Sequence, residues 1–125
     1  MSALNKQVGG DHYKRMAMQP TVFITKNELL FNEGNIVKYV CRYKNRNGLE
    51  DLEKILQYCD FIENKGSFGK ALYAVPTSVF TSKNNLSHDQ YIVVYMTAHA
   101  ERDSFNTRLR CIREATKRLM KEYEK

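Results

Sequence analysis

The 125-residue chain is long enough for one compact domain or two small ones, and its 20 Lys and Arg residues outnumber its 14 Asp and Glu residues. The resulting net charge of +6 favours anionic partners, namely nucleotides, nucleic acid or an acidic protein surface. No stretch approaches the roughly 18 apolar residues of a membrane span. Three widely spaced cysteines without an export signal predict reduced thiols in a cytoplasm.

The first 34 residues are predicted to hold little regular structure. Residues 1–20 are polar and contain glycine, which predicts an extended or looped arm that Pro20 closes. The segment after Pro20 predicts a helical turn or two that end near Gly34. From Asn35 onwards, apolar residues recur at helical spacing and predict a first well-defined helix.

A second helix is predicted to follow and to complete a helical hairpin. Asn47 and Glu50 form a capping-box pattern ahead of a run of apolar residues at helical spacing, so a turn at residues 45–48 joins the two helices. The segment 64–70 holds two glycines and a serine, which is typical of a boundary. The chain is therefore divided into 1–64 and 65–125, packed as one compact unit.

The second half is predicted to begin with two strands. Residues 71–80 and 90–98 are rich in β-branched and aromatic side chains and are separated by a turn-forming segment, which indicates a short β-hairpin. Ser104 is expected to cap a long last helix that reaches the end of the chain. The predicted fold class is α+β: an N-terminal helical hairpin, a β-hairpin and a C-terminal helix.

One alternative for the second half stays open. Ser87 and Gln90 also have the spacing of a capping box, which would make residues 88–124 largely helical. Only the low helix propensity of the β-branched residues at 91–95 argues against this interpretation. We detect no internal repeat in the sequence.

Polar residues of the predicted hairpin fall into two groups at 100° per residue. Asn35, Lys38 and Arg42 share an exposed stripe opposite the apolar side of the first helix. A lysine and an arginine four residues apart repel each other on a helix, so an anion is expected there. Phosphate fits, because arginine offers a planar fork of donors and lysine a point charge. A solvated helix surface is the alternative interpretation.

The second group lies beside the apolar face of the second helix. Asp51, Lys54 and Tyr58 fall within about 60° of one another. Asp51 could orient Lys54 or Arg42, or could contact a ribose hydroxyl or magnesium. Tyr58 could instead be an aromatic residue at the edge of the core whose hydroxyl reaches water.

The first half resembles the SaV-like domain family of tailed-phage proteins. The resemblance covers residues 6–64 and rests on the ordered motifs "GGDHYK", "GNIVKYVCRYKNRNG" and "EDLEKILQY". Residues 65–125 are not recognised. The resemblance implies a nucleotide-binding protein in the cytoplasm of the infected bacterial host. The implied substrate-binding residues are His12, Tyr13, Lys14, Asn35, Lys38, Tyr39, Arg42, Asp51, Lys54 and Tyr58.

One branch of that family is described as a deoxynucleoside monophosphate kinase, which implies ATP and magnesium as cofactors if this chain shares the activity. The sequence has no GxxxxGK[ST] phosphate loop, because "GSFGK" at 66–70 is too short and is followed by Ala71. Ile55 also replaces the small alanine that is common in the family. The catalytic residues are unknown, and no metal site is predicted.

Two further functions stay open. The same cationic stripe, paired across a homo-oligomer with intersubunit sites, could sequester a nucleotide or a cyclic-nucleotide immune signal as an anti-defence protein. A nucleic-acid or host-protein binder is the third hypothesis. It rests on a basic stripe along the last helix, formed by Arg110, Arg113, Lys117 and Lys121.

Histidines and cysteines are not assigned to a site. The three histidines, at 12, 88 and 99, lie far apart without a cysteine at ligand spacing, so zinc is not expected. Cys41 and Cys59 lie at helical core positions and are interpreted as small apolar fillers.

If Lys38 and Arg42 form a surface site, replacing either by alanine should abolish binding and leave the melting temperature nearly unchanged.

Overall fold

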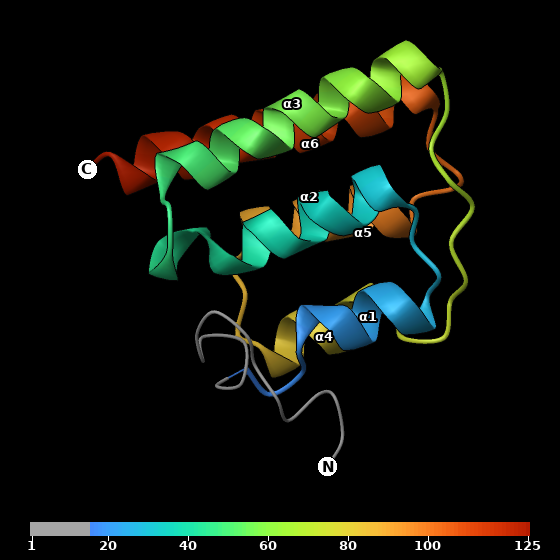
Figure 1. The fold of residues 1–125 in the computed structure, drawn as a ribbon, viewed down its shortest axis with the longest axis horizontal. Helices are drawn as coiled ribbons and strands as arrows, with labels where there is room; N and C mark the ends of the chain where they lie inside the picture. Colours follow the sequence, from blue (N-terminus) through green and yellow to red (C-terminus); the bar gives the residue numbers. More distant parts are fainter. Residues whose placement is uncertain (1–15) are drawn as a thin grey trace.

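A computed structural model describes residues 16–125, and within that range the chain forms α-helices, one short 3-10 helix and no strand. The elements are α1 (Pro20–Lys26), α2 (Phe31–Arg42), η2 (Tyr43–Asn45), α3 (Leu49–Lys65), α4 (Thr77–Lys83), α5 (His88–Ala98) and α6 (Phe105–Tyr123). The helices form two layers, with α1, α2 and α3 in front of α4, α5 and α6 respectively (Figure 1). The segment 66–76 joins the layers along one side.

The predicted α+β class is wrong, because both predicted strands belong to the helical layer behind. The first strand prediction, 71–80, runs into α4, and the second, 90–98, lies within α5. Helix α5 packs against α2, α4 and α6, so apolar side chains are needed all round it. Because apolar residues lie on every side of α5, its sequence shows no helical period. The β-branched run was therefore predicted to be a strand.

The capping-box alternative for α5 is confirmed. The Ser87 hydroxyl accepts a hydrogen bond from the Gln90 backbone N–H at 3.2 Å, and the Gln90 side chain accepts from the Ser87 N–H at 2.8 Å. The predicted cap of the last helix is also present, since Ser104 accepts from the Thr107 N–H. The start of α6 is thus fixed by local chemistry that the sequence displays.

The first half follows the predicted helical hairpin with shifted boundaries. Helix α2 begins at Phe31 and continues through Gly34, so the predicted helix end at that glycine is wrong. Gly34 lies against Ile24 of α1, and a Cβ there would sit 3.1 Å from the isoleucine side chain. Close packing of α1 on α2 explains this interior glycine.

The predicted capping box before α3 is also wrong. Gly48 with φ of +55° precedes the helix, and no side chain caps it. The end of α3 agrees with the predicted boundary, since Gly66 adopts the left-handed conformation that commonly terminates a helix. The arm predicted for residues 1–20 lies largely outside the described residues, and Pro20 is the first residue of α1.

The hydrophobic core lies between the two layers of helices and is continuous. It is built from apolar residues of all six helices, and its largest fully buried members are Phe23, Phe80, Ile36, Leu52, Ile55, Ile62 and Ile112. Phe23 of α1 and Phe80 of α4 stack with ring centres 4.6 Å apart. In the part of the chain that is described, no helix is long and apolar enough to cross a membrane.

Candidate functional site

Three cations surround the ring of Tyr39 on α2. The Lys38 Nζ, the Arg42 guanidinium carbon and the Lys54 Nζ lie 4.6, 4.8 and 5.3 Å from the ring centre. The Tyr39 ring is itself nearly buried, so it forms a floor to which the cations attach by cation–π contact. We call Lys38, Tyr39, Arg42, Asp51, Lys54 and Tyr58 the Tyr39 cluster.

Arg42 is held by Asp51 in a bidentate ion pair. Its Nε donates to Oδ2 and its Nη2 donates to Oδ1, both at 3.1 Å. Asp51 is fully buried and lies 3.5 Å from the Asn47 amide nitrogen. The pair fixes the plane and position of the guanidinium, which is the geometry that recognises a planar or tetrahedral oxyanion.

The burial of Asp51 bears on two predictions, the effect of Arg42→Ala on the melting temperature and the role of Asp51 itself. Alanine at position 42 would leave a fully buried carboxylate without its cation, so Arg42 also stabilises the fold and an unchanged melting temperature is no longer expected. Of the roles considered for Asp51, orienting Arg42 is the one that the structure shows. Lys54 pairs weakly with exposed Glu50 instead, at 3.8 Å.

Positive charge dominates the Tyr39 cluster. Any two of its three cations lie within about 10 Å, which is the screening length at roughly 0.1 M salt. Among residues 16–125, the anions paired with these cations are the buried Asp51 and the largely exposed Glu50. Mutual repulsion raises the free energy of this arrangement, and an anion bound beside the ring would lower it.

An exposed aromatic surface adjoins the cations. The Tyr58 ring lies 6.0 Å from Tyr39, 6.0 Å from Phe31 and 5.4 Å from Phe61. Burial and the neighbouring Tyr39, which also hydrogen-bonds to it, raise the pKa of Tyr58, so its hydroxyl stays a neutral donor. Phe31 is 75% exposed and Phe61 47% exposed. Large exposed aromatic residues beside a charged site are suited to stacking on a planar ring.

A groove runs along α2 from the aromatic surface towards Lys38. It has a volume of about 250 Å³, and its walls include Leu30, Phe31, Asn35 and Lys38. The Asn35 amide donates to the Phe31 carbonyl at 2.9 Å, so the side chain lies along the groove. The groove therefore connects an apolar wall with the cation at its end.

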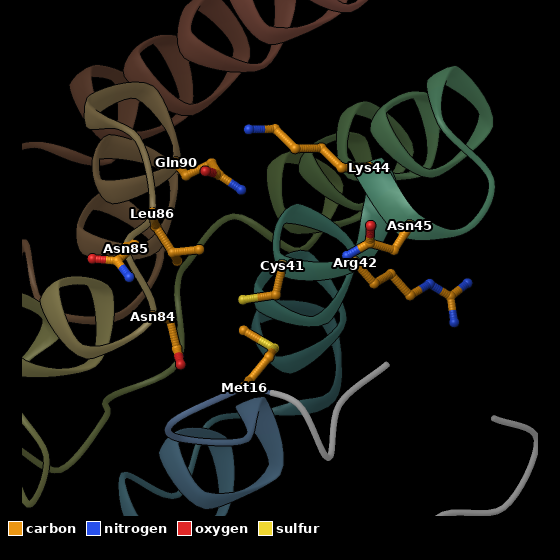
Figure 2. A pocket seen from close by; sticks show the side chains of 9 residues that line it. All are labelled: Met16, Cys41, Arg42, Lys44, Asn45, Asn84, Asn85, Leu86 and Gln90. Carbon is orange, nitrogen blue, oxygen red and sulfur yellow. The ribbon is translucent and has the colours of Figure 1, made fainter. Parts of the chain in front are cut away.

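A second hollow lies on the other side of Arg42. It is formed by the C-terminal end of α2 and the turn between α4 and α5, and Figure 2 shows the Arg42 guanidinium directed away from it. Lys44 and Gln90 approach it from opposite elements. Its volume of about 180 Å³ is smaller than the roughly 250 Å³ of the groove along α2. The Tyr39 cluster with its groove is the better candidate.

Most of the predicted site residues lie together. The Tyr39 cluster contains six of them, and Asn35 lines the adjoining groove. His12, Tyr13 and Lys14 lie outside the described residues. Phe31 was missed, although it is four residues before Asn35 and continues the same stripe; the signal was hidden because α2 was predicted to begin too late.

Other predicted features have structural roles. Burial raises the pKa of Cys41 and Cys59, the latter to about 12, as expected of inert core thiols. Among residues 16–125, no group of three or more His, Cys, Asp or Glu could hold a metal ion. On α6, Arg113 pairs with Asp60 and Glu63, which neutralises part of the predicted basic stripe.

Residues 8–60 match the model of a phage-associated family described as protein of unknown function (DUF3310). The match covers the segment that carries the SaV-like resemblance, but it supports neither that name nor a kinase activity. No curated protein and no solved structure matches the chain.

Proposed function

We propose that the protein binds a phosphate-bearing nucleotide at the Tyr39 cluster, in the cytoplasm of a phage-infected bacterium. The observation that carries the proposal is the convergence of Lys38, Arg42 and Lys54 on one tyrosine ring. Asp51 pairs with Arg42 and the exposed Glu50 pairs weakly with Lys54, so three cations face two anions and, among residues 16–125, the cluster keeps a positive charge. A phosphate group supplies the compensating charge.

The aromatic surface favours a nucleotide over inorganic phosphate. Phe31 is exposed over most of its surface and lies at the edge of Tyr58, within the same groove as Lys38. A base stacked on an aromatic side chain contributes about 1–3 kcal/mol. With the phosphate beside Lys38 and the base against Phe31, one mononucleotide would contact both parts of the site.

The proposal is binding without phosphoryl transfer. Both carboxylate oxygens of Asp51 accept hydrogen bonds from Arg42, and the side chain is fully buried. This carboxylate is thus a positioning group for the guanidinium and is not placed to take a proton from a ligand. Sequestration of a nucleotide, including a cyclic-nucleotide signal, fits this arrangement better than a kinase.

Equilibrium binding of the four deoxynucleoside monophosphates, and separately of cyclic dinucleotides, tests the proposal. We expect Lys38→Ala to weaken binding at least tenfold, while Lys117→Ala on α6 removes the same charge from an exposed helix and leaves binding unchanged. Equal affinities of both variants and the unaltered protein would refute the site. Failure of every probe to bind would refute nucleotide binding.

A chromatographic assay separates sequestration from catalysis. The protein is incubated with a bound nucleotide, ATP and magnesium, and the nucleotides are analysed before and after heat denaturation of the protein. Sequestration predicts a nucleotide that disappears from solution and returns chemically intact. Formation of diphosphates in proportion to protein would instead establish a kinase and contradict binding without chemistry.

A further inference from the structure

The helices of the second half repeat the spacing of the first. Helix α1 begins at Pro20 and α4 begins 57 residues later, at Thr77; the two end at Lys26 and Lys83, again 57 residues apart. Helices α2 and α5 begin at Phe31 and His88 with the same separation. Helices α3 and α6 follow it to within one residue at each end. The layers in Figure 1 are therefore two copies of one order of short, medium and long helices.

The turn after the first helix of each half has the same unusual backbone. Within the described part of the chain, Glu28 and Asn85 are the two non-glycine residues with positive φ, at 55° and 52°, and they are also 57 residues apart. The following leucines, Leu29 and Leu86, each donate a backbone hydrogen bond of 3.0 Å to a carbonyl five residues earlier. Side chains rarely adopt this conformation, so its recurrence is informative.

Many buried positions of the first half have buried counterparts in the second half. Ten residues of α2, η2 and α3 and their counterparts 57 positions later are all buried. The pairs are Glu33 and Gln90, Ile36 and Val93, Val37 and Val94, Val40 and Thr97, Tyr43 and Ala100, Asp51 and Arg108, Leu52 and Leu109, Ile55 and Ile112, Cys59 and Thr116, and Ile62 and Leu119.

The two halves also exchange equivalent hydrogen bonds. The Asn27 side chain donates to the Val75 carbonyl and accepts from the Val75 N–H, at 2.9 and 2.8 Å. The Asn84 side chain makes the same two bonds with Met18, at 2.7 and 3.0 Å. Each asparagine reaches into the other half, which is the reciprocal pattern of a two-fold interface.

Aromatic and helical contacts across the middle follow the same symmetry. Phe23 stacks on its own counterpart, Phe80. Helix α2 packs on α5, and α3 packs on α6, so each helix contacts its equivalent in the other half. In the orientation of Figure 1 the two-fold axis runs vertically between the front and back layers.

We propose that residues 18–65 and 75–122 are two copies of one three-helix unit, fused as a two-fold pair, and that the second copy serves as the permanent partner subunit of the first. The surface of the first copy that faces the axis is apolar, and α4, α5 and α6 cover it. A protein with one such unit per chain would need a second chain to cover the same face. The fusion supplies that chain covalently.

The second copy has not kept the Tyr39 cluster. At the six equivalent positions it carries Tyr95, Met96, His99, Arg108, Cys111 and Ala115. The buried position of Asp51 is taken by an arginine, whose Nε and Nη2 donate to the Met96 and Thr97 carbonyls at 2.9 and 3.0 Å. The second copy thus keeps the framework and the interface but lacks the residues of the anion site.

One nucleotide per chain follows, a consequence that rests on the proposed function. Calorimetric titration of the intact protein should give a stoichiometry of one, and two equivalent sites would show that the second copy also binds. The duplication itself needs a test that does not depend on a ligand. Circular permutation provides this test, because the two-fold symmetry requires the gap between the second copy and the first to equal the gap that 66–76 spans.

In the proposed pair Glu122 is equivalent to Lys65 and Pro20 to Thr77, so the gap from Glu122 to Pro20 equals the gap that 66–76 spans from Lys65 to Thr77. A permuted chain of residues 67–123 followed directly by 10–66 bridges it with an equal number of residues, Tyr123 and 10–19. We expect this permutant to be monomeric, to match the unpermuted circular dichroism spectrum and to unfold cooperatively within about 10 °C of the unpermuted protein.

A second permutant, residues 67–125 followed by 1–66, keeps every residue and has a longer joint. If it folds and the shorter version does not, the gaps are unequal and the two-fold arrangement is refuted. If neither folds, the second copy is not an interchangeable partner and the proposal is equally overturned.

Discussion

The two halves of the molecule place a charged side chain at the same buried position and satisfy it in opposite ways. In the first half Asp51 accepts both hydrogen bonds of Arg42. In the second half Arg108 donates to two carbonyls near the end of α5. One framework thus supports a cationic site on one side and a closed, internally bonded surface on the other. Function here depends on the residues placed on the framework, not on the framework itself.

The difference extends to the residue that faces this charge. Arg42 lies between Asp51 and the Tyr39 ring. Both ring nitrogens of its counterpart His99 are bonded within the second half: Nδ1 lies 2.8 Å from the Thr77 hydroxyl, and Nε2 lies 2.9 Å from the Leu72 carbonyl. A histidine with both nitrogens bonded has no further polar group to offer a ligand. The comparison can be tested one position at a time.

The largest effect is expected from breaking the buried ion pair. Arg42→Ala leaves the Asp51 carboxylate buried without a cation and should lower the free energy of unfolding by about 3–5 kcal/mol. Urea denaturation measures the change. The double variant Arg42→Met, Asp51→Leu removes both charges and should recover most of the stability. Equal loss in both variants would show that the charge is not the cause.

Breaking the reciprocal asparagine bonds should have the next largest effect. Asn27→Ala leaves the buried Val75 N–H and carbonyl without that partner, at a cost of about 1–3 kcal/mol per group. Asn84→Ala does the same to Met18, but this site is only half-buried and the loss should be smaller. Thermal unfolding of both variants checks the order. A neutral Asn27→Ala would contradict the equivalence of the two contacts.

Removing the exposed aromatic residue should affect binding but not stability. Phe31→Ala should weaken nucleotide binding about tenfold, because stacking contributes about 1–3 kcal/mol. Its counterpart in the second copy is His88, so His88→Ala is the matched control and should leave affinity unchanged. Both affinities come from calorimetric titration. A larger loss in the control would place the base on the other half.

The smallest effect is a pH dependence confined to the second half. Burial lowers the pKa of His99, so the folded state favours the neutral ring. Its contribution to stability is present above the unfolded pKa of roughly 6.5 and is lost as pH falls from there towards the lowered pKa. Melting temperatures at pH 7.5 and 5.5 should differ less in His99→Gln than in the unaltered protein. An unchanged difference would exclude His99 as its source.

The sequence was sufficient where local chemistry and periodicity agreed. The boundary at 64–70 and the cap at Ser104 were predicted from glycine and serine, whose local chemistry ends or begins a helix. The last helix was predicted because its apolar residues lie on one face only. Helix α5 was not predicted, because other helices cover it on several sides and it therefore lacks a polar face. Without that face, the β-branched run was given more weight than the capping-box pattern.

The internal duplication and the burial of Asp51 were also missed. The two copies agree mainly in apolar character at buried positions, where Ile36 and Val93 or Cys59 and Thr116 count as equivalent only once burial is known. Identity is concentrated in α1 and α4, where "VFITKNEL" at 22–29 and "VFTSKNNL" at 79–86 share five of eight residues; this short repeat was overlooked in the sequence. Asp51 lies at the edge of the apolar face of α3. Whether its carboxylate is buried depends on how α2 packs there, which the sequence does not display.

Calorimetric titration of a deoxynucleoside monophosphate into Lys54→Ala and Cys111→Ala tests the central claim most directly, because these positions are equivalent in the two copies. The account predicts one nucleotide per chain for the unaltered protein, a loss of affinity of at least tenfold in Lys54→Ala and no change in Cys111→Ala. Unchanged binding by Lys54→Ala, or an equal loss in both variants, would contradict an anion site that belongs to the first half alone.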